Sequence, residues 1–112
     1  MRAGFSRGDQ RVLRVRLRVT NVGNRSGAAV PQIYVGRLPT VRVRTAPRQL
    51  AGFARVDLRS GRSRQVTVRV PREAYSFWDS GRDRWVTPRG RLRIFVGRDA
   101  LTPVASTTVR VR

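Results

Sequence analysis

The sequence predicts an all-β protein, an antiparallel β-sandwich of seven to eight short strands. Apolar and polar residues alternate with a period of two through most of the chain, as in "VLRVRLRV" at residues 12–19. Turn-forming sequences recur at short intervals, and no segment places apolar residues at helical spacing. The 112 residues suit one domain. We expect the sandwich at residues 10–112 and a frayed or disordered lead-in at residues 1–9.

In the first expected strand, residues 13–19, the apolar side chains and the arginines must lie on opposite faces of the sheet. A second strand is expected at residues 27–36, where Pro31 indicates a sheet edge or a bulge. A third is expected at residues 48–58, and Gly52 within it indicates a bulge or a bend. These three segments supply the first half of the sandwich.

The second half of the chain repeats the alternating pattern. Residues 74–78 and 84–86 flank the turn sequence "DSGRD" and are expected to pair as a hairpin. The long connection at residues 36–47 is expected as an exposed loop, or as a loop that carries a short edge strand at 41–43. The remaining strands are expected at residues 64–70, 91–97 and 104–111.

The charge balance is unusual. Arginine supplies all 25 basic residues, only six carboxylates oppose them, and the formal net charge is +19. Such a charge predicts non-specific affinity for polyanions, including nucleic acids. The arginines are nevertheless spread along the whole chain and lysine is absent, which indicates a genome that favours arginine codons. Arg14, Arg16 and Arg18 are therefore expected to form the solvated face of a strand.

The residue types present exclude several kinds of chemistry. The chain has no histidine and no cysteine, which rules out Ser–His–Asp triads, Cys–His dyads and the usual zinc sites. Asp79 and Asp83 bracket a turn, where carboxylates are expected to accept backbone N–H groups rather than to act as a catalytic pair. We therefore predict no catalytic residue, no metal site and no cofactor. No membrane span or signal peptide is predicted either, and the localisation stays open.

The aromatic residues give the clearest indication of a partner. Phe77 and Trp78 are adjacent, so on a strand they face opposite sides and one of them must point out of the sandwich. An aromatic side chain on the outer face indicates contact with a neighbouring domain or a ligand. The candidate contact residues are Tyr34, Trp78 and Trp85, together with the connection at residues 36–47.

Seven short motifs follow one another in a recognisable order: "VTNVGNRSGAAVPQIYV" (19–35), "PRQLAGF" (47–53), "RVDLRSGRSRQVTVRV" (55–70), "YSFWD" (75–79), Trp85, "PRG" (88–90) and "IFVG" (94–97). By these motifs the chain resembles, from about Val15 to Val111, the fibronectin type III-like domain that ends glycoside hydrolase family 3 enzymes of the β-glucosidase type. Arginine, glutamine or alanine stands at Arg48, Gln49 and Ala51, where that family usually has lysine or glutamate.

The resemblance implies an immunoglobulin-like, fibronectin type III-like sandwich that is not itself an enzyme. In the family, an upstream (β/α)₈ barrel and α/β domain hydrolyse O-glycosyl bonds, and the sandwich packs against them and supports their arrangement. The implied partners of this chain are therefore such catalytic domains, in the same or a neighbouring chain. No position of this sequence matches a catalytic motif of the family.

Two other functions remain open from the sequence. A stand-alone carbohydrate-binding sandwich would display two or three coplanar exposed aromatic rings. A polyanion or nucleic-acid binder would gather its arginines on one face. An enzyme in its own right ranks last among these readings.

Overall fold

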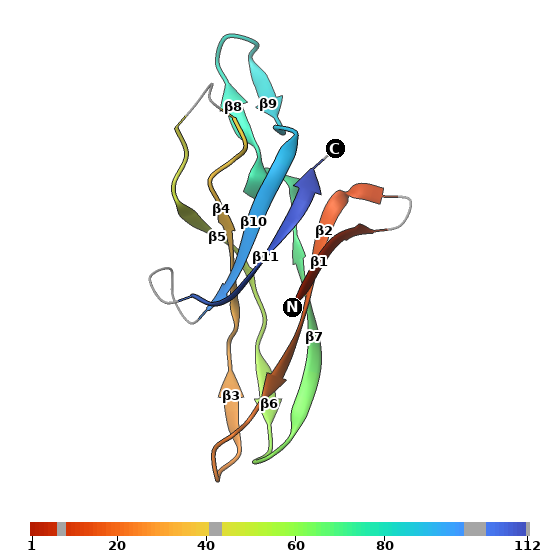
Figure 1. Cartoon of the computed structure of the whole chain (residues 1–112), viewed down its shortest axis with the longest axis vertical. Helices are drawn as coiled ribbons and strands as arrows, with labels where there is room; N and C mark the ends of the chain where they lie inside the picture. Colours follow the sequence, from red (N-terminus) through yellow and green to blue (C-terminus); the bar gives the residue numbers. More distant parts are fainter. Residues whose placement is uncertain (7–8, 41–43, 98–102, 112) are drawn as a thin grey trace.

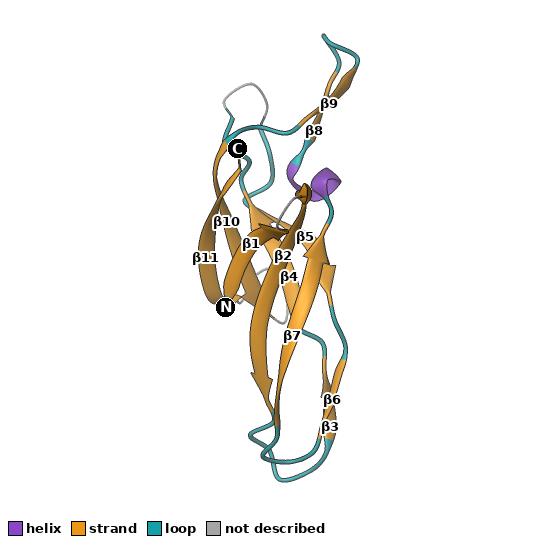
Figure 2. Cartoon of the chain, turned by 90° about the vertical axis from the view of Figure 1, so that its right-hand side faces the viewer, coloured by secondary structure: helices purple, strands orange, loops and turns teal. Residues whose placement is uncertain are grey.

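The computed structural model describes residues 1–6, 9–40, 44–97 and 103–111 of the chain. Two antiparallel sheets form its body and face each other in an elongated molecule of 55 × 32 × 20 Å (Figures 1 and 2). The three-stranded sheet has the order β1 (Arg2–Ser6), β2 (Asp9–Thr20), β7 (Ser63–Val70). The four-stranded sheet has the order β11 (Pro103–Val111), β10 (Gly90–Gly97), β4 (Gln32–Gly36), β5 (Arg48–Phe53).

Two small two-stranded sheets extend this body at opposite ends. β3 (Gly27–Ala29) pairs with β6 (Val56–Leu58) at the lower end in Figure 1. β8 (Phe77–Asp79) pairs with β9 (Arg84–Val86) at the upper end. The short 3₁₀ helix η1 (Arg72–Tyr75) connects β7 to β8. The predicted all-β sandwich is confirmed.

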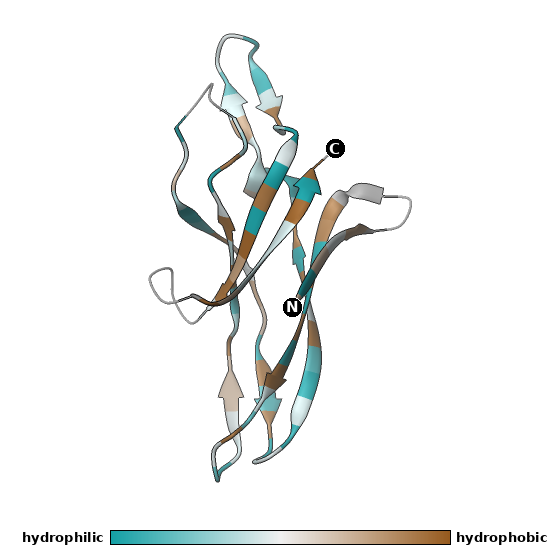
Figure 3. Ribbon diagram, viewed as in Figure 1, coloured by the Kyte–Doolittle hydropathy of each residue, from teal (hydrophilic) through white to brown (hydrophobic). Residues whose placement is uncertain are grey.

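The alternating pattern of the strands builds the core. Along β2, Leu13, Val15 and Leu17 are buried while the intervening arginines are exposed, as the period of two predicts. The same alternation of apolar and polar residues is visible along β10 in Figure 3. Each fully buried aliphatic side chain contributes about 1.5–3 kcal/mol. The buried core cluster consists of Leu13, Val15, Leu17, Ile33, Val35, Val68, Val70, Tyr75, Leu92, Ile94, Val96, Val109 and Val111.

The N-terminal segment differs from the expected lead-in. Within residues 1–9, Arg2–Ser6 form β1, which pairs with β2 in a register that sets Phe5 opposite Leu13. The Phe5 ring makes an edge contact with the buried Tyr75 ring, at 6.3 Å between centroids. This contact with a residue far along the chain stabilises the ordered conformation of the segment.

The expected second and third strands are each divided in two. The second breaks at Val30–Pro31, between β3 and β4, because proline has no N–H to donate to a sheet. The third breaks after Phe53, and the pairing of β4 with β5 shifts register opposite Gly52, as the predicted bulge requires. A Cβ at Gly52 would lie only 2.9 Å from Cγ1 of Val68, so glycine allows β5 to approach β7 closely.

The hairpin predicted from the "DSGRD" turn is present, although it starts later than expected. Residues 72–75 form η1 directly after Pro71, and β8 begins only at Phe77. The described parts of the long connection, residues 37–40 and 44–47, belong to no strand, and the edge strand suggested at 41–43 lies outside the described residues. Within the described ranges, no helix is long and apolar enough to cross a membrane.

Candidate interaction surface

The β8–β9 hairpin projects beyond the two main sheets in both Figure 1 and Figure 2. Its base is fixed by hydroxyl groups: Ser76 donates to the carbonyl of Arg72 at 2.7 Å, and the hydroxyls of Ser76 and Thr87 lie 2.7 Å apart. The Nε of Arg72 also donates to the Thr87 hydroxyl, at 2.6 Å. Directly before this base, the buried Tyr75 anchors η1 in the core.

The tip of the hairpin is held by Asp79. Its Oδ1 accepts the backbone N–H groups of Gly81 and Arg82 at 3.0 and 3.3 Å, and its Oδ2 lies 3.7 Å from Nε of Arg82. Asp83 adopts the left-handed conformation, with φ of +52°, that closes the turn. Asp79 is buried, and its carboxylate stabilises the turn by accepting backbone N–H groups, as the sequence predicts.

The two tryptophans of the hairpin lie directly opposite each other, Trp78 on β8 and Trp85 on β9. Their rings meet edge to face, at 5.8 Å between centroids and an interplanar angle of 77°. Both remain exposed to solvent, Trp78 by 49% and Trp85 by 59%, whereas the neighbouring Phe77 is buried. The opposite orientation of Phe77 and Trp78 predicted from the sequence is confirmed.

Tyr34, the third candidate, does not lie with the tryptophans and is not exposed. It belongs to β4, where Ile33 and Val35 enter the core, so its side chain lies on the outer face of the four-stranded sheet. There it pairs with Phe95 on one side and Leu50 on the other, and only 6% of it is exposed. Its hydroxyl makes a hydrogen bond with Oε1 of Gln32.

Arginine side chains cover part of this outer face. The guanidinium carbons of Arg48 and Arg93 each lie 5.3 Å from the centre of the Phe95 ring, a cation–π distance. Nη1 of Arg48 is buried, and it has no hydrogen-bond partner among the described residues. The sequence gives no signal for this stacking, since Arg48 lies 47 positions before Phe95, and Arg93, two positions before it, belongs to the general arginine background.

Strand β5 adds an exposed apolar surface that the sequence does not indicate. It is an edge strand of its sheet, and Leu50 and Phe53 are 51% and 66% exposed. The alternation in "RQLAGF" does not reveal this exposure, because a period of two cannot tell an edge strand from a central one. The connection between β4 and β5 has hydrogen bonds of its own. The Thr45 carbonyl accepts from the Arg37 side chain, and the Thr45 hydroxyl accepts from the backbone N–H of Leu38.

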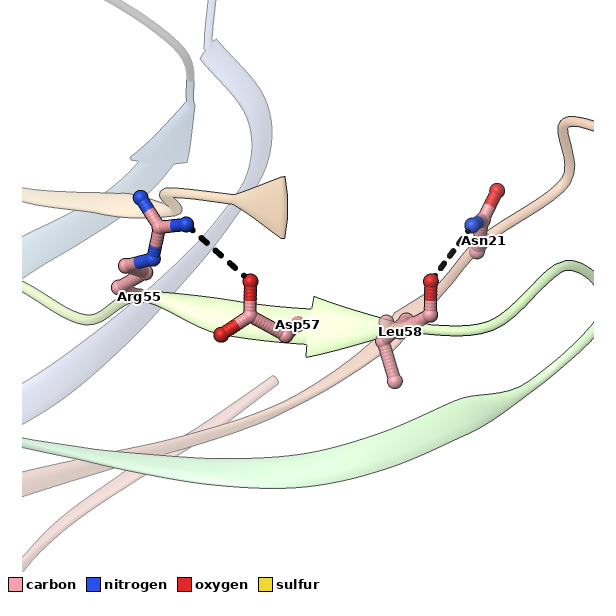
Figure 4. Close-up of polar contacts among 4 residues, drawn as sticks. All are labelled: Asn21, Arg55, Asp57 and Leu58. Atoms are coloured by element: carbon pink, nitrogen blue, oxygen red, sulfur yellow. Dashed lines mark hydrogen bonds and ion pairs between the residues drawn. The ribbon is translucent and has the colours of Figure 1, made fainter. Parts of the chain in front are cut away.

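The opposite end of the molecule is held by backbone and amide contacts (Figure 4). Nδ2 of Asn21 donates to the carbonyls of Leu58 and Arg25, at 2.9 and 2.8 Å. On β6, the exposed Asp57 pairs with Arg55 at 3.2 Å. The described carboxylates Asp57 and Asp79 thus each serve a local contact, at opposite ends of the fold. Within the described ranges no group of His, Cys, Asp and Glu could hold a metal ion.

These features define an antiparallel β-sandwich module with an exposed aromatic hairpin at one end. The model of the fibronectin type III-like domain family matches residues 29–100. The chain belongs to this family.

Relatives with similar sequences include probable β-glucosidases of several fungi. The chain is 40% identical over 79 residues to probable β-glucosidase L of Aspergillus terreus, covering 70% of this chain and 11% of that protein. It is 38% identical over 107 residues to probable β-glucosidase G of Neosartorya fischeri, covering 88% of this chain and 13% of that one. The crystal structure of DesR, a β-glucosidase from Streptomyces venezuelae in complex with D-glucose, superposes with a TM-score of 0.92 at 32% identity, over 99% of this chain and 14% of DesR.

The chain therefore spans only 11% to 14% of the length of these three relatives. It is a non-catalytic domain similar to one part of family 3 β-glucosidases, and the catalytic part of those enzymes lies outside the 112 residues. The resemblance seen in the order of sequence motifs is confirmed.

Proposed function

We propose that this sandwich is an accessory domain that packs against the catalytic domains of a family 3 glycoside hydrolase and stabilises their arrangement. The observation that carries the proposal is the superposition of 99% of the chain on 14% of a β-glucosidase, with a TM-score of 0.92. A fold reproduced so fully inside a larger enzyme supports the same placement for this chain, in one polypeptide or between two.

The β8–β9 hairpin is the contact that we assign to this docking. Tryptophan is enriched among the residues that dominate binding energy at protein interfaces. Trp78 and Trp85 present two half-exposed indole rings on a hairpin whose base and tip are both fixed by hydrogen bonds. A rigid aromatic projection loses little conformational freedom when it is covered by a partner.

The alternative of a stand-alone carbohydrate-binding sandwich receives less support from the same residues. Stacking on a sugar chain would need coplanar rings, whereas the planes of Trp78 and Trp85 stand at 77° to each other. Tyr34 contributes no exposed ring. If the chain is not retained on insoluble cellulose, the result agrees with this preference. Retention that is lost in W78A would instead support the carbohydrate-binding function.

The docking proposal is tested in a chimera. The segment of the Streptomyces venezuelae β-glucosidase that superposes on this chain is replaced by residues 1–112, and a second version lacks the segment altogether. We expect the chimera to recover most of the melting temperature and glucoside hydrolysis that the deletion removes. A chimera as unstable and inactive as the deletion would contradict the proposed function.

The contribution of the hairpin is isolated by a double comparison. Trp78→Ala and Phe53→Ala are each made in the isolated chain and in the chimera, and unfolding free energies are measured in both. We expect W78A to cost about 2 kcal/mol more in the chimera than in the isolated chain. Phe53, which lies on β5 and is also exposed, serves as the matched control. Equal costs of W78A in both settings would remove the hairpin from the interface.

A further inference from the structure

The outer face of the β1–β2–β7 sheet carries a dense group of arginines. The pairing of the strands places them on the side opposite to the buried Leu13, Val15 and Leu17. All of them are exposed. We call this surface the arginine face, and it consists of Arg2, Arg14, Arg16, Arg18 and Arg69.

The strand register sets like charges directly against each other on this face. Arg2 of β1 lies opposite Arg16 of β2, and Arg14 of β2 lies opposite Arg69 of β7. Directly opposed residues in a sheet have Cβ atoms about 4.5–5.5 Å apart, and like charges at that separation destabilise the pairing. Along β2, alternate arginines follow at intervals of about 6.8 Å, twice the rise of an antiparallel strand.

No carboxylate among the described side chains compensates these charges. Asp57 pairs with Arg55 on β6, and Asp79 pairs with Arg82 at the tip of the hairpin. The two ion pairs that the described residues form thus lie away from the arginine face. Its positive charge is left for a ligand from solution.

The outer face of the four-stranded sheet also sets two arginines against each other, Arg91 of β10 opposite Arg110 of β11, but it engages other arginines within the protein. There, Arg48 and Arg93 are engaged with the Phe95 ring, and Tyr34 and Leu50 lie in the same row of directly paired residues as Phe95. Arginine there is partly used in contacts within the protein. On the arginine face, the described residues supply neither rings nor carboxylates to engage the guanidinium groups.

We propose that the arginine face binds an anionic polysaccharide, a chain whose sulfate or carboxylate groups follow one another at regular intervals. Guanidinium groups form paired hydrogen bonds with such planar or tetrahedral oxyanions. The same face presents the hydroxyl of Thr67 and the amide of Gln65, opposite Arg16 and Arg18, which can bond to sugar hydroxyls. This binding is independent of the docking of the hairpin.

The composition of the face favours a polysaccharide over a single-stranded nucleic acid. Proteins that hold single strands combine basic grooves with aromatic side chains on which the bases stack. In the described registers of β1, β2 and β7, no aromatic residue lies on the side of the arginine face. The exposed tryptophans belong to a separate hairpin at the end of the molecule.

The test uses the full chain on immobilised heparin, a sulfated polysaccharide, with elution by sodium chloride. The face variant is R14Q/R16Q/R69Q, and the matched control R25Q/R59Q/R62Q removes three exposed charges from outside the face. We expect the face variant to elute at clearly lower salt and the control to elute close to the unaltered chain. The slope of log affinity against log salt should fall by roughly one for each contacting arginine removed.

Other results would overturn the proposal. Equal losses in the two triple variants would show that heparin responds to net charge alone. Tighter binding of poly(dT) than of heparin at equal charge concentration would assign the face to nucleic acid. If the face variant does not fold, R14K/R16K/R69K keeps the charge while removing the guanidinium fork. It should bind heparin several-fold more weakly than the unaltered chain, and unchanged binding would contradict the proposed recognition.

Discussion

At the scale of single residues, the side chain of Asp79 and the missing side chain of Gly52 illustrate two kinds of local requirement. Asp79 supplies the acceptor for two backbone N–H groups in the hairpin turn. Gly52 leaves the space into which Val68 of the facing sheet fits. One position therefore depends on a polar group that is present, and the other on a methyl group that is absent.

Replacing Asp79 by alanine should destabilise the hairpin. Asp79→Ala removes the side-chain acceptor of the Gly81 N–H, one of the two acceptors of the Arg82 N–H, and the ion pair to Arg82, a loss of about 1–3 kcal/mol. The change is measured by hydrogen exchange of the hairpin amides. Asp79→Asn, which keeps an oxygen at the acceptor position, is the control and should cost less. Equal protection in D79A and the unaltered chain would refute the role of the carboxylate.

Replacing Gly52 by alanine should destabilise the sandwich as a whole. The added Cβ would lie 2.9 Å from Cγ1 of Val68 and 3.3 Å from the carbonyl oxygen of Arg69, so the two sheets must shift. Such overpacking costs about 1–3 kcal/mol. Chemical denaturation of G52A measures this loss. Gly27→Ala, where a Cβ meets no atom within 4 Å, is the matched control and should be nearly neutral.

Residue alternation predicted the two rows of β2 but not the surroundings of Tyr34. Alternation along a strand requires Tyr34 to face away from Ile33 and Val35, and in the structure it does. It cannot show that Phe95, Leu50 and Gln32 enclose the ring on the outer face. The burial of Tyr34 depends on side chains from three neighbouring strands, so the sequence around Tyr34 alone cannot predict it.

At the scale of strands and turns, the predictions succeed where an alternating run is long or a turn signal is strong. The long strands β2, β7 and β10 overlap the predicted strands, and the β8–β9 hairpin forms around the predicted turn, although its first strand starts only at Phe77. β1 escapes prediction because its apolar signal consists of Ala3 and Phe5 alone, and its order depends on pairing with β2 and on the contact with Tyr75. The division after β3 falls at Pro31, whereas the division after β5 depends on which partner strand each half meets, which local sequence does not specify.

The hairpin should behave as a separable element. A two-stranded sheet is marginally stable by itself, and an aromatic pair contributes about 0.5–1.5 kcal/mol to it. Trp85→Ala should therefore speed hydrogen exchange of the β8 and β9 amides while core amides of β2 and β10 stay protected. Phe53→Ala should leave the hairpin amides unchanged. Uniform loss of protection throughout the chain in W85A would show that the hairpin is integral to the core.

At the scale of the whole molecule, the net charge of +19 opposes the compact state through self-repulsion. Added salt screens this repulsion, since the Debye length falls from about 10 Å at 0.1 M to about 3 Å at 1 M. We therefore expect the melting temperature to rise with sodium chloride. Sodium chloride and sodium perchlorate are compared at equal ionic strength to separate screening from specific anion effects. A melting temperature independent of ionic strength would contradict this account.

The same repulsion makes a further prediction for the arginine face. Removing Arg16 relieves its direct opposition to Arg2, so Arg16→Thr should raise the melting temperature at low salt. The gain should shrink at high salt, where charges separated by more than a few ångströms are screened. Arg59→Thr, in a turn outside the paired strands, is the control and should give a smaller gain. A stabilisation of R16T that is unaffected by salt would point to strand propensity rather than charge.

The distribution of arginine between paired strands and connecting turns also determines where trypsin can cleave the folded chain. Trypsin cleaves after arginine, and it needs a locally extended, unpaired backbone to do so. Arg14, Arg16 and Arg69 lie inside hydrogen-bonded ladders, whereas Arg25, Arg59 and Arg82 lie in turns at the two ends of the molecule. Brief digestion should thus cleave the folded domain first at its two ends and leave the sandwich body as associated fragments. The order in which the arginines are cleaved should therefore distinguish the paired from the unpaired backbone.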